Sequence, residues 1–194
     1  MPTLDISFVT GLLGSLVLVT GAAWPETAEN VPPYKSAKDW LFAVGGLLML
    51  AYAILGYLAG GPVFFVFLEV LVVIASLLMM LNTPDAFDTP VISLVGLGFI
   101  AWSLTLFEGY NTVFFILGLT GVGLGYAFQM GTVRRSLALT AGSVLIALFS
   151  YIEQSWIFFW LNVFFAIFSS YYVLIHFFAP VKFFTQRIEK TFHR

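Results

Sequence analysis

The distribution of Lys and Arg constrains the fold of this chain more than any other feature. Hydropathy divides the 194 residues into seven long apolar stretches, and the cations fall only in odd-numbered loops and in the C-terminal tail. The N-terminal segment and the even-numbered loops carry none. Because translocated loops resist carrying Lys or Arg outward, cations mark the cytoplasmic side of a membrane protein. The eight cations are Lys35, Lys38, Arg134, Arg135, Lys182, Arg187, Lys190 and Arg194.

This pattern predicts an all-α integral membrane protein with seven transmembrane helices. A helix satisfies its own backbone hydrogen bonds in lipid, and about 20 apolar residues cross the hydrocarbon core. The odd number of spans places the N-terminus outside and the C-terminus in the cytoplasm. The predicted spans are 6–24, 40–58, 62–81, 90–107, 112–129, 136–152 and 156–178.

Composition excludes several classes of function. Apolar residues make up 60% of the chain and charged residues only 9%, against about 25% charged residues in a soluble domain. The seven spans take up nearly the whole chain, so no soluble catalytic domain is expected. The chain has no Cys and only two His, and no paired acids lie within a span. We therefore expect no enzyme activity, no cofactor, no metal site and no nucleic-acid partner.

An internal repeat is most visible between the third and seventh spans. At a constant offset of 93 residues, Glu69 corresponds to Asn162 and Ser76 corresponds to Ser169. Two positions seven residues apart lie on the same face of a helix, separated by about 10 Å along its axis. The recurrence of this polar pair in two otherwise apolar helices predicts two related helical units.

Weaker matches extend the repeat to the other spans. Residues 10–14 match residues 117–121, and residues 46–48 match residues 142–144. The predicted organisation is two parallel three-helix repeats joined by a linker helix, an arrangement that places a transport site at the interface of the repeats. The units are residues 1–85, the linker 86–110, the second unit 111–179 and a cytoplasmic tail 180–194. Apolar residues of the tail recur every four positions among cations, which predicts a short amphipathic helix on the inner leaflet.

This plan resembles the SWEET sugar transporters, the wider PQ-loop group and the Pnu-type nicotinamide-riboside transporters. The resemblance rests on the 3+1+3 arrangement, on polar residues at matching depth in spans 3 and 7, and on Trp24-Pro25-Glu26, which is similar to the Pro-Gln motif. It implies that Asn162 and Glu69 stand where these families carry a cavity-lining Asn in each unit. Tyr52 or Leu50 in the first unit, and Ile146 in the second, would take the place of the cavity Trp that the family carries in the second helix of each unit. The motif Pro-Gln itself is absent.

Glu69 is the only ionisable side chain well inside a span. Placing a charged side chain at the centre of a bilayer costs about 2.5–3.5 kcal/mol on insertion scales, so such residues usually serve a function. We expect Glu69 to face a central site and to couple transport to a proton or cation. Asn162 both donates and accepts hydrogen bonds, which suits a neutral polar solute. Ser76 and Ser169 would extend the polar stripe, and Trp160 or Phe158 could stack on a flat or sugar ring.

The sequence thus predicts a carrier for a small polar solute such as a sugar or a vitamin-like molecule, embedded in the lipid bilayer. Two alternatives stay open: a channel for a small solute, and a PQ-loop-like subunit or receptor that transports nothing. A retinal-binding photoreceptor is excluded because span 7 contains no Lys for a Schiff base. Residue patterns leave the solute, the direction of flux and the oligomeric state undetermined.

Overall fold

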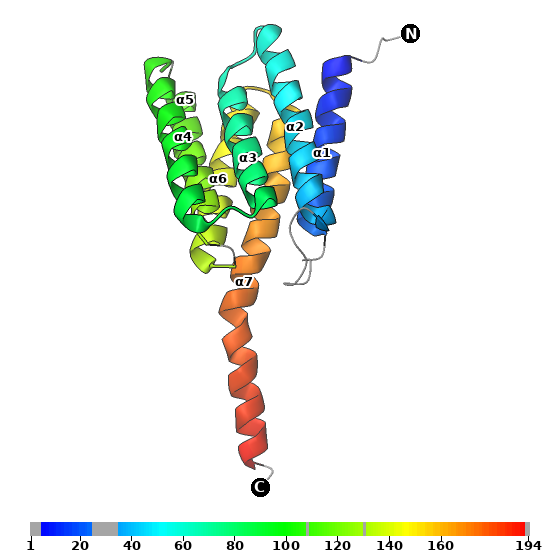
Figure 1. The fold of residues 1–194 in the computed structure, drawn as a ribbon. Coiled ribbons are helices and arrows are strands. Elements are labelled where there is room, and N and C mark those ends of the chain that lie inside the picture. The colour runs from blue at the N-terminus through cyan, green and yellow to red at the C-terminus, as the bar shows by residue number, and fades with distance from the viewer. Residues whose placement is uncertain (1–4, 25–34, 108, 130, 193–194) are drawn as a thin grey trace.

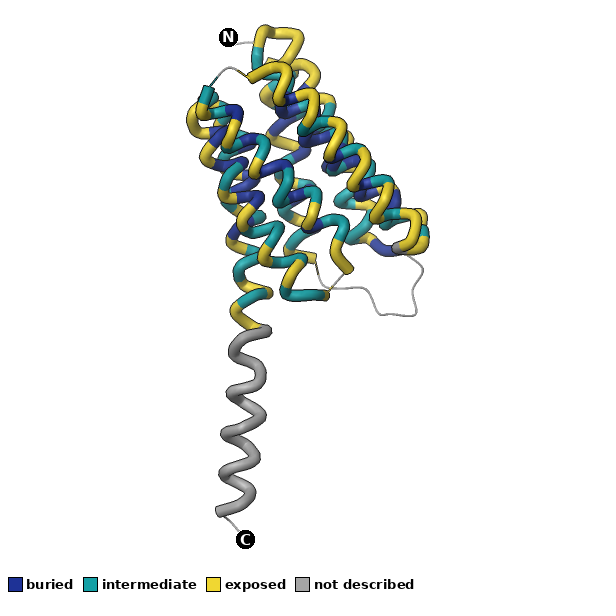
Figure 2. The backbone as a smooth tube through the Cα atoms, turned by 90° about the vertical axis from the view of Figure 1, so that its left-hand side faces the viewer, coloured by how far each residue is buried: buried dark blue, intermediate teal, exposed yellow. Residues whose placement is uncertain are grey.

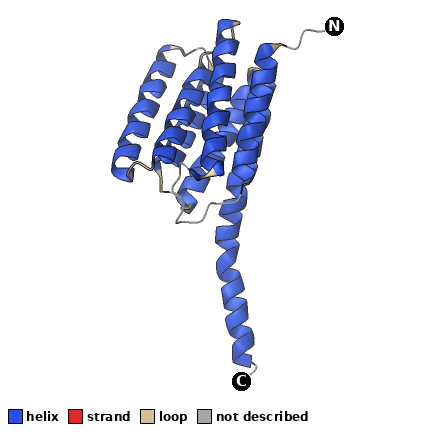
Figure 3. Cartoon of the chain, turned by 45° about the vertical axis from the view of Figure 1, so that its right-hand side comes forward, coloured by secondary structure: helices blue, strands red, loops and turns tan. Residues whose placement is uncertain are grey.

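A computed structural model describes residues 5–24, 35–107, 109–129 and 131–192, and for residues 85 and 176–192 it describes the backbone only. This part of the chain forms seven helices and no strand (Figure 3). All seven are long and apolar enough to cross a membrane. The helices are α1 Ile6–Ala23, α2 Ala37–Leu58, α3 Phe64–Leu81, α4 Asp85–Thr105, α5 Tyr110–Ala127, α6 Val133–Ile152 and α7 Trp156–Phe192.

The predicted spans agree with these helices, with a marked difference at the start of α4. The helix begins at Asp85, five residues before the predicted start, and it includes Pro90. The predicted span excludes Asp85 and Asp88, yet acids are favourable near a helix N-terminus. Helix α7 continues to Phe192. The predicted amphipathic face of the tail depends on side chains that lie outside the described residues.

The helices form a closed ring in chain order. Each helix packs against the next one, and α7 packs against α1 to complete the ring. Figure 1 shows the helices running up and down in alternation. The described Lys and Arg side chains lie where α2 and α6 begin, and we call this the basic end of the bundle. Helices α1, α3, α5 and α7 therefore run toward the basic end.

The outer surface of the ring is apolar. Exposed and intermediate residues cover the outward faces of the helices, whereas the buried residues gather between them (Figure 2). A soluble protein rarely exposes so large an apolar surface. The surface and the seven apolar helices indicate a multi-pass integral membrane protein. Large apolar side chains exposed on this surface include Leu94, Leu97, Ile167 and Leu174.

Glycines bring α1 and α2 into close contact. A Cβ added at Gly14 would lie 3.0 Å from the backbone N of Met49, and one at Gly45 would lie 3.0 Å from the backbone N of Leu18. Leu18 and Met49 are almost completely buried beside these glycines. Such small-residue contacts let two membrane helices approach closely and gain packing energy.

The same contacts recur between α5 and α6. A Cβ at Gly118 would lie 3.0 Å from the backbone N of Ile146, and one at Gly142 would lie 2.5 Å from the backbone N of Val122. The α5 residues follow their α1 counterparts by 104 positions, and the α6 residues follow their α2 counterparts by 97 positions. The sequence matches described above used offsets of 107 and 96. Glycines recur every three or four residues in α1 and α5, so the first match slipped by about one helical turn, and the second match slipped by one residue because Gly45 and Gly46 are adjacent.

The turns after α2 and α6 also have the same geometry. Gly60 has φ 93° and Gln154 has φ 56°, so each turn contains one residue in the left-handed region. In both turns a hydrogen bond of 2.9 Å spans five residues, from Gly61 N–H to Gly56 O and from Ser155 N–H to Ser150 O. This is the helix-ending arrangement in which an orphan carbonyl is satisfied by the amide beyond the cap.

Candidate functional site

Two stacked phenylalanine side chains lie in the middle of the helix bundle. Phe65 of α3 and Phe158 of α7 have centroids 4.2 Å apart and planes inclined by only 5°. They are 93 residues apart, the offset that pairs Glu69 with Asn162. Each ring also has a neighbour from the other predicted unit, and these two neighbours correspond to each other at the offset of 97. Tyr52 of α2 lies 5.3 Å from Phe158, and Phe149 of α6 lies 5.3 Å from Phe65.

Six rings from five helices close the bundle at the end opposite the basic end. Phe115 of α5 lies 4.9 Å from Phe64 of α3 and 5.2 Å from Phe149, which extends the stack across the ring. All of these side chains are buried except Tyr52, which is partly buried. We call this set the aromatic cluster: Tyr52, Phe64, Phe65, Phe115, Phe149 and Phe158.

Glu69 and Asn162 lie directly beyond the stacked rings. Each follows its stacked Phe by four residues, about one helical turn toward the basic end, so both lie on the interior faces of their helices. Glu69 is 2% exposed and Asn162 is 6% exposed. Glu69 lies five residues into α3, which corresponds to about 7.5 Å of helix. Residues predicted to share one site therefore lie in the same layer of the interior.

The polar atoms in this layer differ in their hydrogen bonding. Asn162 Nδ2 donates to the carbonyl of Phe158 at 2.9 Å, within its own helix. Glu69 Oε2 has no hydrogen-bond partner among the described residues. A buried polar atom without a partner is unusual and costly, and it is found where a ligand, an ion or water binds. One oxygen of the Glu69 carboxyl group thus has hydrogen-bonding capacity that the described residues leave unmet.

The other predicted site residues are distributed unevenly. Ser76 is buried and its Oγ has no partner in the described part of the chain, whereas Ser169 is only partly buried. Tyr52 belongs to the aromatic cluster. Trp160 is 55% exposed and lies edge-on to Phe159, on a surface of α7 that does not face the interior. The interior therefore contains the side chains of Glu69, Asn162 and Ser76, but not the indole ring of Trp160.

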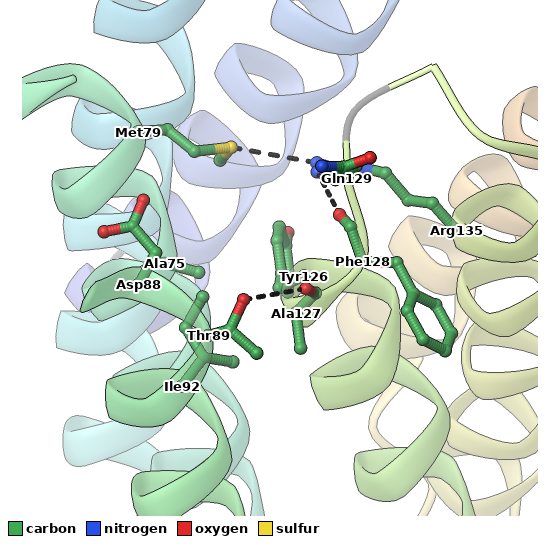
Figure 4. Close-up of a pocket in the computed structure, with 10 residues that line it drawn as sticks. All are labelled: Ala75, Met79, Asp88, Thr89, Ile92, Tyr126, Ala127, Phe128, Gln129 and Arg135. Atoms are coloured by element: carbon green, nitrogen blue, oxygen red, sulfur yellow. Dashed lines mark hydrogen bonds between the residues drawn. The ribbon is translucent and has the colours of Figure 1, made fainter. Parts of the chain in front are cut away.

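A pocket at the basic end was not anticipated from the sequence. It has an empty volume of about 360 Å³ and lies between α3, α4, α5 and α6 (Figure 4). One wall is Arg135, whose Nη1 donates to the carbonyl of Phe128 at 3.4 Å and whose Nη2 lies 3.7 Å from Met79 Sδ. Thr89 Oγ1 donates to the carbonyl of Ala127 at 3.2 Å on another wall. We call this the basic-end pocket.

The sequence carried one hint of this pocket. Arg135 follows α5 by a short link and stands in the first turn of α6, where a cation is unfavourable beside the helix dipole. The contact across to α3 depends on how four helices pack side by side, which no local pattern encodes.

No family model, curated protein or solved structure matches the chain. Within the described residues, no three His, Cys, Asp or Glu side chains lie close enough together to hold a metal ion.

Proposed function

We propose that this protein is a membrane carrier that moves a small polar solute by alternating access at a central site between two three-helix units. The first unit is α1–α3, the second is α5–α7, and α4 links them. The site is the interior layer that contains Glu69 and Asn162. The solute would be a sugar or a vitamin-like molecule, as the resemblance to SWEET-like transporters implies.

The stacking of Phe65 on Phe158 is the observation that carries this proposal. When two units are related by a twofold axis, equivalent residues can touch each other only near that axis. Phe65 and Phe158 are equivalent by the offset of 93 and they touch. The repeated glycine contacts and the repeated turns support the same relation between the units. An axis between the two rings would also pass between Glu69 and Asn162.

The packing of the interior supports a carrier over a channel. The aromatic cluster fills the interior, with one pocket at the basic end and another beside Tyr52, Phe65 and Phe158 at the opposite end. A channel needs a continuous path, whereas alternating access requires a path that is closed on at least one side. By the distribution of cations, the basic end would face the cytoplasm, with the N-terminus outside.

The chemistry of the central layer suits a solute with hydroxyl or amide groups. Asn162 can donate and accept, and the partnerless oxygen of Glu69 accepts from a solute or binds a proton or cation. A polar solute would thereby make hydrogen bonds that the described residues do not make with each other.

A ligand screen tests this proposal. We expect the purified protein to gain thermal stability with one class among sugars, vitamins, nucleosides and amino acids, since a ligand at a hundred times its Kd adds about 2.7 kcal/mol. Asn162→Leu should remove this gain because Leu has a similar volume but no amide. Trp160→Phe, on the outer surface of the same helix, should retain it. A ligand whose effect is equal in both variants would contradict the central site.

A further inference from the structure

The basic-end pocket has an arginine side chain reaching across it. Arg135 extends from the start of α6 toward Met79 on α3, so its guanidinium lies between two helices that are not neighbours in the ring (Figure 4). Its Cζ lies 5.8 Å from the centroid of the Tyr126 ring, which supports the cation from one side. The guanidinium is thereby held at the pocket rather than in the solvent.

The hydrogen-bonding capacity of this guanidinium is largely unused by the described residues. A guanidinium has five N–H donors, and ordinary N–H···O bonds measure about 2.7–3.2 Å. The two acceptors within reach of Arg135 are a carbonyl at 3.4 Å and a thioether sulfur at 3.7 Å, both long contacts to neutral groups. The described residues form no ion pair with it. Asp88, on another wall, is hydrogen-bonded by the Thr83 hydroxyl.

The start of α6 adds positive charge beside the pocket, although the carboxylate of Asp88 on another wall opposes an anion. Arg134 and Arg135 both stand in the first turn of α6, next to the positive end of its dipole. A bound oxyanion would compensate the charge of Arg135 and the dipole through the side chain, because the backbone N–H of Arg135 already donates to the Thr132 hydroxyl at 3.3 Å.

We propose that the basic-end pocket binds an oxyanion, a carboxylate or phosphate group, on the guanidinium of Arg135. The planar fork of Arg matches the two oxygens of such a group. The oxyanion can belong to a free solute or to the headgroup of an anionic lipid, since basic pockets between transmembrane helices bind the phosphate groups of such lipids. Anion binding at this site does not require transport activity. The proposal therefore goes beyond the function proposed above and is tested independently of it.

Inorganic phosphate is the probe for the first arm of the test. Titrated against the protein in neutral detergent, at constant ionic strength set with sodium chloride, it should raise the thermal midpoint. Arg135→Gln should weaken the apparent affinity about tenfold or more, because a charge-assisted hydrogen bond contributes about 1.5–3 kcal/mol. Arg134→Gln removes the same charge from an exposed neighbour and should change it by much less.

The second arm replaces phosphate with lipid. The same proteins are placed in nanodiscs of neutral phosphatidylcholine, with or without phosphatidylglycerol. Stabilisation by free phosphate assigns the pocket to a soluble anion, and stabilisation by phosphatidylglycerol alone, lost in Arg135→Gln and kept in Arg134→Gln, assigns it to a headgroup. If Arg135→Gln does not fold, Arg135→Lys retains the charge without the fork and should bind several-fold more weakly. Equal behaviour of the variants at the two positions, or no response to either anion, would overturn the proposal.

Discussion

Replacement of Glu69 by glutamine is expected to abolish the pH dependence of solute uptake in proteoliposomes. The carboxyl group donates and accepts hydrogen bonds when protonated and only accepts when ionised, whereas the glutamine amide resembles the protonated acid at every pH. The variant should therefore behave at alkaline pH as the unmodified protein does at acidic pH. A coupling of about 1.4 kcal/mol between protonation and solute binding changes the affinity about tenfold. We expect the apparent affinity of the unmodified protein for its solute to change about tenfold with pH, and that of the variant to be nearly independent of pH.

A matched control separates this effect from a general loss of charge. Glu153 caps α6 at the end opposite the basic end, where its Oε1 accepts a hydrogen bond of 2.7 Å from Asn111. Glu153→Gln removes one carboxylate outside the interior and should leave the pH profile unchanged. If the Glu69 variant keeps the full pH response of the unmodified protein, Glu69 is a packing residue and the proposed coupling is wrong.

Substitution of Gly142 by valine is expected to cause the largest loss of stability. A Cβ at this position would lie 2.5 Å from Val122 N, 2.8 Å from Gly121 C and 2.9 Å from Gly118 O, all of them backbone atoms. Overpacking commonly costs about 1–3 kcal/mol, and here no side chain can rotate away, so α5 and α6 must separate. We expect a lower thermal midpoint and a smaller monodisperse fraction in size-exclusion chromatography.

Other glycines provide a graded comparison for this variant. A Cβ at Gly98 of α4 meets nothing within 4 Å, so Gly98→Ala should be neutral or stabilising, because Ala favours a helix by about 1 kcal/mol over Gly. Gly45→Ala should be destabilising, but less so than Gly142→Ala, since its nearest contact is the flexible side chain of Leu18 at 2.7 Å. An equal loss at Gly98 and Gly142 would contradict the close packing of α5 on α6.

The positions of the helices could be predicted because hydropathy acts locally along the chain. Each span needs only enough apolar length to cross a bilayer, and all seven predicted spans coincide with helices. The start of α4 was misplaced because Asp85 and Asp88 do not look like part of an apolar span. Acids are nevertheless favourable in the first turn of a helix, where the environment is polar. Pro90, with which the predicted span began, lies inside the helix.

The central layer could be anticipated in part, and only from the repeat. The offset of 93 paired Glu69 with Asn162, but nothing in the sequence indicated that Phe65 would stack on Phe158. That contact depends on the arrangement of α3 and α7 across the ring. Trp160 was a candidate because its indole can stack on a ring, yet the seventh span is aromatic on every face, so residue type alone does not identify the interior side.

The basic-end pocket could not be predicted for a related reason. Its walls come from four helices, and the reach of Arg135 to Met79 joins positions 56 residues apart. A cation in a loop is ordinarily taken to mark the cytoplasmic side of the membrane, and Arg135 was interpreted in this way from the sequence. Only the packing of the helices distinguishes Arg135 from its exposed neighbour Arg134.

Cross-linking across the interior tests most directly whether the acid and the amide face each other at the interface of the two units. The chain contains no native cysteine, so Glu69→Cys with Asn162→Cys introduces a single reactive pair. A short bifunctional methanethiosulfonate should join this pair in membranes, as read by gel mobility after cleavage at an engineered protease site between α4 and α5. Efficient joining of this pair, with little joining of Glu69→Cys to Trp160→Cys, is the predicted result. Cross-linking of Glu69→Cys to Trp160→Cys, without cross-linking of Glu69→Cys to Asn162→Cys, would contradict the account.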